Sequence, residues 1–427
     1  MIKYIYGDNM AKRKRIKPIW KIIFTALLIG ITLIYGYIVD HDKKDNKSDN
    51  DSNIIEKITK KKEDKKKVNL TLVGDIMFEG LYLDSINQGD DPNTYLSMVG
   101  DKYFKKDDLT IGNLETTITD NDKLKVNGYG FEFCTPQEII KGLDNNSVDV
   151  LGTTNNHSTD RGIDGINNTI DYLKNNTNIT SVGTYKSKED RSNFRIIEKN
   201  GVKVGFVAYA LGLNDFGKYI TNEESWRLGL YRNPPSYNVI TEENKELIRQ
   251  EVRALRKECD VLVAIMHWGQ EFHFEEREVD QHALSRLLNE EKVDIVLGSH
   301  SHCMQPIEWY TSNDGYKTLV FYSLGNFTSS DMNDVSSRGG YEYMMAYQIA
   351  LLANIDIELD KDNKLIYNSI KTEPIINYFN SNKRDFRMIP LSEYNSTYET
   401  SHYLYNQGLN VNYINNLYNR IIPQEFR

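Results

Sequence analysis

The residues best suited to chemistry in this sequence are two histidines one position apart, His300 and His302. They follow a short apolar run that breaks at Gly298, which is typical of a buried strand entering a loop. In an extended loop, residues i and i+2 point the same way, so both imidazoles can face one point. Neutral imidazole is a favoured ligand of zinc, iron and manganese. The pair predicts half of a metal site, although an isolated pair of this kind is more often exposed on a loop.

Other potential ligands stand just after predicted strands in the same way. They are Asp75, Glu115, Asn156 and His267. Each one alone reads as a turn, cap, surface or core residue. In α/β folds, however, functional groups collect at the carboxyl ends of strands, and six such placements together favour one shared site. Carboxylate, amide and imidazole ligands in this mixture suit one or two divalent ions of manganese, iron or zinc.

The polar run that contains Asn156 also offers catalytic groups. His157 can act as a general acid that protonates a leaving group, and Asp160 can orient its imidazole. Arg161 and Asn326 are candidate substrate-binding residues. The alternative is that the run only caps the following helix. Cys303, beside His302, is a weaker candidate ligand, whereas Cys134 and Cys259 are expected in the core.

Short apolar runs alternate with helical segments between Val68 and Tyr322, which predicts an α/β fold. The predicted strands are Val68–Val73, Leu109–Ile111, Val148–Leu151, Val202–Ala210, Val261–Met266, Asp294–Leu297 and Thr318–Tyr322. The predicted helices are Pro136–Asn145, Gly165–Asn175, Glu242–Glu258 and Val279–Glu291. Tyr341–Leu359 is expected to add strands, and the segment 381–427 is expected to form a helical tail.

The N-terminal part of the chain has the pattern of a membrane anchor. Residues 1–21 are basic, and residues 22–39 are 18 uncharged positions, enough to cross a bilayer core as a helix. A cleaved signal peptide is the competing interpretation, but no small-residue cleavage pattern follows the run. The denser basic cluster on the N-terminal side predicts a cytoplasmic N-terminus, and residues 40–67 read as a disordered tether. The main domain, 68–380, and the tail would then lie outside the cell.

Charge is distributed unevenly along the 427 residues. The whole chain carries a net charge of −9, whereas residues 1–67 hold 17 Lys or Arg against 9 Asp or Glu. The remainder is therefore strongly acidic. This balance excludes nucleic acid as an expected partner, because phosphate binding needs many cations. An anionic substrate would have to be held locally, by metal or by a few placed cations.

Six ordered motifs between Val68 and Thr328 resemble the CapA family of capsule-synthesis proteins. They are G-D-I-M, G-N-L-E, N-N-H-x-x-D-x-G, H-W-G-x-E-F, G-x-H-x-H-x-x-Q-P-I-E and Y-S-L-G-N-F. The resemblance implies a calcineurin-like metallophosphatase fold, a four-layer sandwich of two sheets flanked by helices. It also implies a membrane-anchored surface protein that acts on poly-γ-glutamate with an amide ligase and small membrane subunits.

Three positions depart from the related patterns. Met77 stands where calcineurin-like phosphatases have a second ligand, Glu115 stands where they have a bridging Asp, and Ser301 replaces a proline between the histidines. Phosphatase chemistry therefore does not transfer directly. Three hypotheses follow: a metal-dependent capsule protein that cleaves, transfers or guides an anionic polymer, a metallophosphoesterase acting on a cell-wall or lipid phosphoester, and a non-catalytic polymer-binding scaffold.

Overall fold

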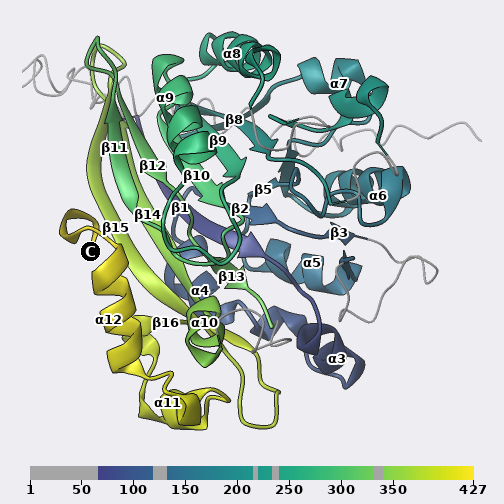
Figure 1. Ribbon diagram of the computed structural model, residues 1–427, viewed down its shortest axis with the longest axis vertical. Coiled ribbons are helices and arrows are strands. Elements are labelled where there is room, and N and C mark those ends of the chain that lie inside the picture. The colour runs from purple at the N-terminus through teal and green to yellow at the C-terminus, as the bar shows by residue number, and fades with distance from the viewer. Residues whose placement is uncertain (1–65, 119–131, 215–219, 233–239, 331–339) are drawn as a thin grey trace, which may run out of the picture. The chain divides into compact units, whose positions relative to one another are not determined.

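The computed structural model in Figure 1 describes residues 66–118, 132–214, 220–232, 240–330 and 340–427. The predicted basic segment 1–21, the predicted span 22–39 and nearly all of the predicted tether lie outside the described residues. Within the described ranges, no helix is both long enough and apolar enough to cross a membrane. One compact unit runs from Lys65 to Arg427.

The larger sheet has the strand order β16-β15-β14-β1-β2-β5-β6, and β13 also pairs with β1. Its strands are β1 (Lys67–Ile76), β2 (Leu109–Leu114), β5 (Val150–Gly152), β6 (Thr180–Val182), β13 (Asn326–Thr328), β14 (Ile349–Leu359), β15 (Leu365–Tyr378) and β16 (Arg387–Pro390). Strands β1, β2, β5, β6 and β13 are parallel, whereas β14 to β16 are antiparallel additions. The register pairs Asp75 with both Asn113 and Asn326. The ends of three strands therefore meet beside Asp75.

The second sheet has the strand order β11-β12-β10-β9-β8-β7. Its strands are β7 (Arg195–Lys199), β8 (Val202–Ala210), β9 (Val261–His267), β10 (Ile295–Ser299), β11 (Ile307–Thr311) and β12 (Lys317–Phe321). Strands β8, β9, β10 and β12 run parallel, and the two edge strands are antiparallel to their neighbours. Ser299 pairs with His267, so β9 and β10 end level with each other.

Most helices pack on the outer faces of the two sheets, whereas the two helices that contain Met344 and Ile414 pack on the core between the sheets (Figure 1). They are α3 (Leu81–Asn87), α4 (Ser97–Val99), α5 (Gln137–Asn145), α6 (Gly162–Asn176), α7 (Lys188–Ser192), α8 (Glu242–Arg256), α9 (Ala283–Glu290), α10 (Tyr341–Tyr347), α11 (Ser396–Ser401) and α12 (Val411–Ile421). A further pair of short strands, β3 (Thr117–Ile118) and β4 (Cys134–Thr135), follows β2.

Alternate side chains of each strand enter different cores. In β8, Phe206 packs between the two sheets, while Val207 faces α8 and α9 on the outer side. In β1, Leu72 packs between the sheets, and Val73 lies in the outer core that includes α3, α4, α5 and α6. The two-residue period of a strand thus produces a mixed α/β arrangement of helices, sheet, sheet and helices.

The predicted strands and helices up to Tyr322 are confirmed within a few residues at their ends. The expectation for Tyr341–Leu359 was wrong in its first part. Residues Tyr341–Tyr347 form α10, because methionine and alanine favour a helix there, and the strand β14 begins only at Ile349, where the apolar run resumes. The segment 381–427 contains α11 and α12 but also β16, which extends the larger sheet.

Candidate metal centre

The loop after β10 turns sharply and carries both histidines inward. His300 and His302 have φ angles of 91° and 58°, so the extended loop expected from the sequence is wrong. A non-glycine residue with positive φ is uncommon and marks local strain, which is frequent at functional sites. The hydroxyl of Ser301 is fully buried and donates to the carbonyl of Cys303 at 2.8 Å. The histidines converge through this tight turn and not through alternation along a strand.

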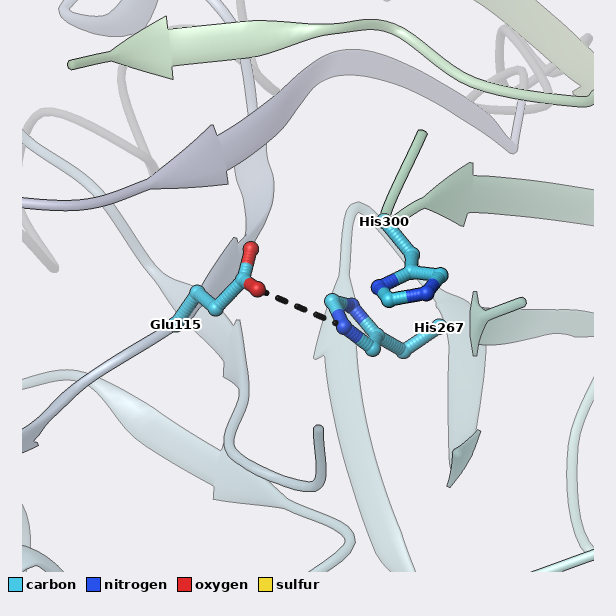
Figure 2. A group of neighbouring side chains, drawn as sticks. All are labelled: Glu115, His267 and His300. Atoms are coloured by element: carbon cyan, nitrogen blue, oxygen red, sulfur yellow. Dashed lines mark ion pairs between the residues drawn. The ribbon is translucent and has the colours of Figure 1, made fainter. Parts of the chain in front are cut away.

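One group of possible metal ligands joins the two sheets and is shown in Figure 2: Glu115, His267 and His300. All three side chains are buried. Nε2 of His267 lies 3.4 Å from Oε1 of Glu115 and 2.7 Å from Oδ1 of Asn156. The imidazoles of His267 and His300 are 4.5 Å apart, centre to centre. Residues at the end of β9 and just after β2, β5 and β10 thus meet at one point.

A second group shares Glu115 with the first and adds Asp75 and His302. Nε2 of His302 lies 3.9 Å from Oε1 of Glu115, and Nδ1 of His302 lies 3.7 Å from Oδ2 of Asp75. The structure therefore brings together all six residues that the sequence predicts as metal ligands. Two groups that share one carboxylate match the arrangement of a site for two ions.

Several orienting residues were missed from the sequence. Asn113 donates to Oδ1 of Asp75 at 2.7 Å, and Ser299 places its hydroxyl 3.0 Å from Nδ1 of His267. Oδ1 of Asn326, predicted as a substrate ligand, lies 2.8 Å from Nδ1 of His302. An Nδ1–H donated to this oxygen leaves Nε2 of His302 free to face Glu115. Asn326 is fully buried, so substrate binding by it stays a prediction.

Burial sets the charge state of the ligand groups. Desolvation raises the pKa of Glu115 well above its usual range, and the negative charges of Asp75 and Glu271 raise it further. Desolvation also raises the pKa of Asp75, against the opposing charge of His302. Burial and the neighbouring His300 and His302 hold the pKa of His267 well below its usual value. Neutral imidazoles are the form that binds metal.

Glu115 shows whether these residues fit a cation. Neither of its buried carboxylate oxygens accepts a hydrogen bond from any described residue, and Nδ1 of the buried His300 is also unpaired among them. Leaving a buried carboxylate without donors costs free energy unless a proton or a cation compensates it. The donor set of two carboxylates, one amide oxygen and three imidazoles suits manganese, iron or zinc. The residues therefore fit one or two divalent ions.

The predicted acid lies beside this centre. Nδ1 of His157 is 2.7 Å from Oδ2 of Asp160, as expected, and its ring stacks on Phe133 with 4.2 Å between ring centres. The side-chain amide of Asn214 lies 3.4 Å from Nε2 of His157 and accepts from Asn156 at 3.3 Å. Desolvation raises the pKa of Asp160, although the hydrogen bond to His157 opposes this. Asn214 thus links the acid to a metal-ligand candidate, a contact that the sequence did not indicate.

The remaining candidates have other surroundings. Arg161 pairs with Glu132 at 2.8 Å, so its predicted role in substrate binding stays a prediction. Cys303 is buried and belongs to neither group of possible ligands found among the described residues. Met77 is buried, and its backbone N–H donates to the carbonyl of Thr328 in β13 at 3.0 Å. It supplies no polar ligand to the centre.

The fold and the buried ligand cluster define an α/β protein with a candidate metal centre at the strand ends. Residues 69–331 match the family described as bacterial capsule synthesis protein PGA_cap, so the chain belongs to that family. It is 28% identical over 259 residues to the PGA biosynthesis protein CapA of Bacillus subtilis (strain 168), covering 60% of this chain and 62% of that protein. It is also 28% identical over 273 residues to the capsule biosynthesis protein CapA of Bacillus anthracis, covering 62% and 61%.

The chain thus matches about three fifths of the length of each of these relatives. Among solved structures, the NAD nucleotidase NadN of Haemophilus influenzae is similar with a TM-score of 0.39 and 9% identity. That similarity covers 76% of this chain and 54% of the nucleotidase.

Proposed function

We propose that this protein is a membrane-anchored capsule biosynthesis protein whose two-ion metal centre acts on an anionic polymer of the poly-γ-glutamate type. Membership of the PGA_cap family supports the capsule role, and the names of both Bacillus relatives carry the same function. The predicted span at residues 22–39 supports a single-pass anchor, with the domain from residue 68 outside the cell. An amide ligase and small membrane subunits are the partners expected from the family resemblance.

The observation that carries the proposal is the shared carboxylate of Glu115. It belongs to both groups of possible ligands, its oxygens have no donor among the described residues, and it is fully buried. Asp75, Glu115 and His302 would hold one ion, and Glu115, Asn156, His267 and His300 would hold the other. When bound, such ions activate water and stabilise developing negative charge.

The chain's own residues would then place and move protons. Nδ1 of His157 donates to the carboxylate of Asp160, and the doubly protonated ring would give its Nε2 proton to the leaving nitrogen of a cleaved amide, which leaves the neutral imidazole. Phe133 stacks on the same ring and Asn214 lies against its Nε2, so the imidazole is held in one orientation. Asn113, Ser299 and Asn326 fix the orientation of the ligand groups.

A metallophosphoesterase is the second candidate function. Two ions on one carboxylate are suited to in-line displacement at phosphorus as well as to attack on an amide. The experiment that separates these functions offers the purified full-length protein, with manganese, either poly-γ-glutamate or a generic phosphodiester. We expect the polymer to shorten and the diester to persist, and we expect His157→Ala to lower polymer cleavage about 100-fold or more.

The matched control is His282→Gln, because the imidazole of His282 contacts the hydroxyls of Tyr310 and Tyr322 and belongs to neither group of possible ligands. Diester turnover that His157→Ala abolishes would favour the phosphoesterase. If capsule is still exported by cells with the double substitution His267→Ala and His302→Ala, the protein would be a non-catalytic scaffold.

A further inference from the structure

A cleft of about 770 Å³ opens at His300, on the side of the metal centre formed by the loop after β9. Its lining includes Arg232, Glu271, Phe272, Arg277, His300 and Tyr343. Two arginines beside a metal ligand are notable in a domain with a strong excess of acidic residues. Neither arginine follows a predicted strand, so the pattern of strand ends does not indicate them.

Both arginines are held by one buried carboxylate, that of Asp280. Nη2 of Arg232 lies 3.2 Å from Oδ2 of Asp280, and Nε of Arg277 lies 3.4 Å from Oδ1. Arg277 also donates to the carbonyl of Gly269 at 3.1 Å. One carboxylate cannot occupy all ten N–H groups of two guanidiniums. The arrangement fixes both side chains and leaves donors available.

Arg232 in particular has unused hydrogen-bonding capacity. Its side chain is only 3% exposed although it lines the cleft, and its Nε has no hydrogen-bond partner among the described residues. A buried donor without an acceptor is unfavourable unless a ligand or water supplies one. Both guanidiniums line the cleft together with His300, so their positive charges lie beside the metal centre.

The charge balance of the cleft limits the kind of anion that fits. The two arginines are offset by Asp280 and by Glu271, which lines the same cleft. Such a cleft has too little net positive charge to bind multiply charged anions strongly. It suits a single negative charge that approaches the guanidiniums, and a planar carboxylate matches the two parallel N–H donors of an arginine.

We propose that Arg232 and Arg277, fixed by Asp280, form a carboxylate subsite beside His300. The subsite binds the pendant α-carboxylate of a γ-linked glutamyl residue, which places the neighbouring amide at the metal centre. This inference rests on the proposed function, since it names the chemical group of the polymer that the cleft binds. Specificity for an acidic polymer then comes from two arginines and not from the overall charge of the protein.

The test is a calorimetric titration of the full-length protein with two synthetic probes, in the presence of manganese. One probe is a γ-linked glutamate pentamer, and the other is the same pentamer with every α-carboxylate converted to a carboxamide. We expect the carboxamide pentamer to bind about tenfold more weakly or worse, because charge-assisted hydrogen bonds are lost. This comparison changes only the ligand, so it does not depend on the folding of a variant.

The variant Arg277→Gln should weaken binding of the acidic pentamer about tenfold and leave binding of the carboxamide pentamer unchanged. Arg277→Lys, which keeps the charge but loses the paired donors, should fall between the two. Arg286→Gln is the matched control, because the half-exposed Arg286 pairs with Glu278 and does not line the cleft. It should bind both pentamers as the wild type does.

Equal binding of the two pentamers would overturn the proposal, and so would an equal loss for both pentamers in Arg277→Gln. Inorganic phosphate that competes more strongly than acetate would also overturn it, by assigning the arginines to phosphoester substrates. Binding that depends on the α-carboxylates, with no cleavage of the polymer, would support the subsite and refute the catalytic function. Cleavage of both pentamers at equal rates would support the catalytic function and refute the subsite.

Discussion

Two fully buried carboxylates of this protein, Asp280 and Glu115, have opposite surroundings. Asp280 accepts hydrogen bonds from the backbone of Gly269 at 3.1 Å and of Gln281 at 3.0 Å, and it contacts Arg232 and Arg277. Glu115 accepts none from the described residues, and the negative charge of Asp75 raises its pKa, while burial holds the pKa of the neighbouring His267 and His300 well below the usual value.

This difference separates a carboxylate that the chain stabilises itself from a carboxyl group that needs a proton or an external cation. A buried carboxylate is tolerated when cations and donors compensate its lost hydration. The chain supplies both to Asp280, which makes it part of the architecture of the cleft. It supplies neither to Glu115, which is the expected state of a ligand shared by two metal ions.

The largest effect should come from Asp280→Asn. Removing this partner leaves the buried guanidinium of Arg232 and the partly exposed one of Arg277 without their counter-charge, and the loss at a buried pair destabilises by about 3–5 kcal/mol. Urea unfolding of the metal-free protein measures this free energy. Asp314→Asn is the control, because Asp314 is exposed and pairs with Lys292 on the surface, and it should have a much smaller effect. Equal stability of Asp280→Asn and wild type would show that the arginines do not depend on Asp280.

A third buried group, His402, is satisfied in its neutral form. Its Nδ1 accepts from the backbone of Leu404, and its Nε2 lies 3.0 Å from the carbonyl of Asn377. Burial lowers the pKa of His402 to about 4, against the opposing effect of the Asn377 carbonyl. Because the folded pKa lies below the unfolded value of 6.5, this contribution to stability is present above pH 6.5 and is lost as the pH falls toward 4.

Between pH 7 and pH 4, the wild type should therefore lose on the order of 3 kcal/mol more stability than His402→Gln. Urea unfolding of both proteins across this range gives the slope of the free energy of unfolding against pH for each protein. Parallel slopes would mean that His402 is not kept neutral by the fold.

A smaller effect is expected from Asn326→Ala, which removes the acceptor for Nδ1 of His302. Loss of an orienting partner of this kind lowers metal affinity about 10–100-fold. Competition with a fluorescent chelator measures the affinity for manganese. Asn354→Ala is the control, because Asn354 donates to Asn69 and Thr71 within the same sheet and touches no ligand candidate. An unchanged affinity in Asn326→Ala would return Asn326 to its predicted role as a substrate ligand.

Much of the site could be predicted because its residues stand at recognisable positions. An apolar strand followed by a polar residue locates Asp75, Glu115 and His267 along the chain, and the parallel strands of each sheet then bring such ends together. The convergence of all six ligand candidates is the structural outcome of that pattern. Local periodicity also predicts the parallel core of the fold.

The contacts that orient the ligands could not be predicted, because they join residues far apart in the chain. The pairing of His302 with Asn326 depends on β13 lying beside β1, and the approach of Arg232 and Arg277 depends on Asp280. The positive φ angles at His300 and His302 also leave no mark in the hydrophobic pattern. Residues 341–347 were expected to form a strand but form a helix, because an apolar run suits a buried helix as well as a strand.

The most direct test of the central claim is the metal content of the full-length protein, purified from manganese-containing medium without chelators and measured by mass spectrometry. We expect two divalent ions per chain in the wild type and at most one in Glu115→Gln, because the shared carboxylate is weakened as a ligand in that variant. We also expect removal of the ions to lower the melting temperature of the wild type. A wild-type protein that holds no divalent ion, and whose melting temperature does not respond to chelator or manganese, would contradict this claim.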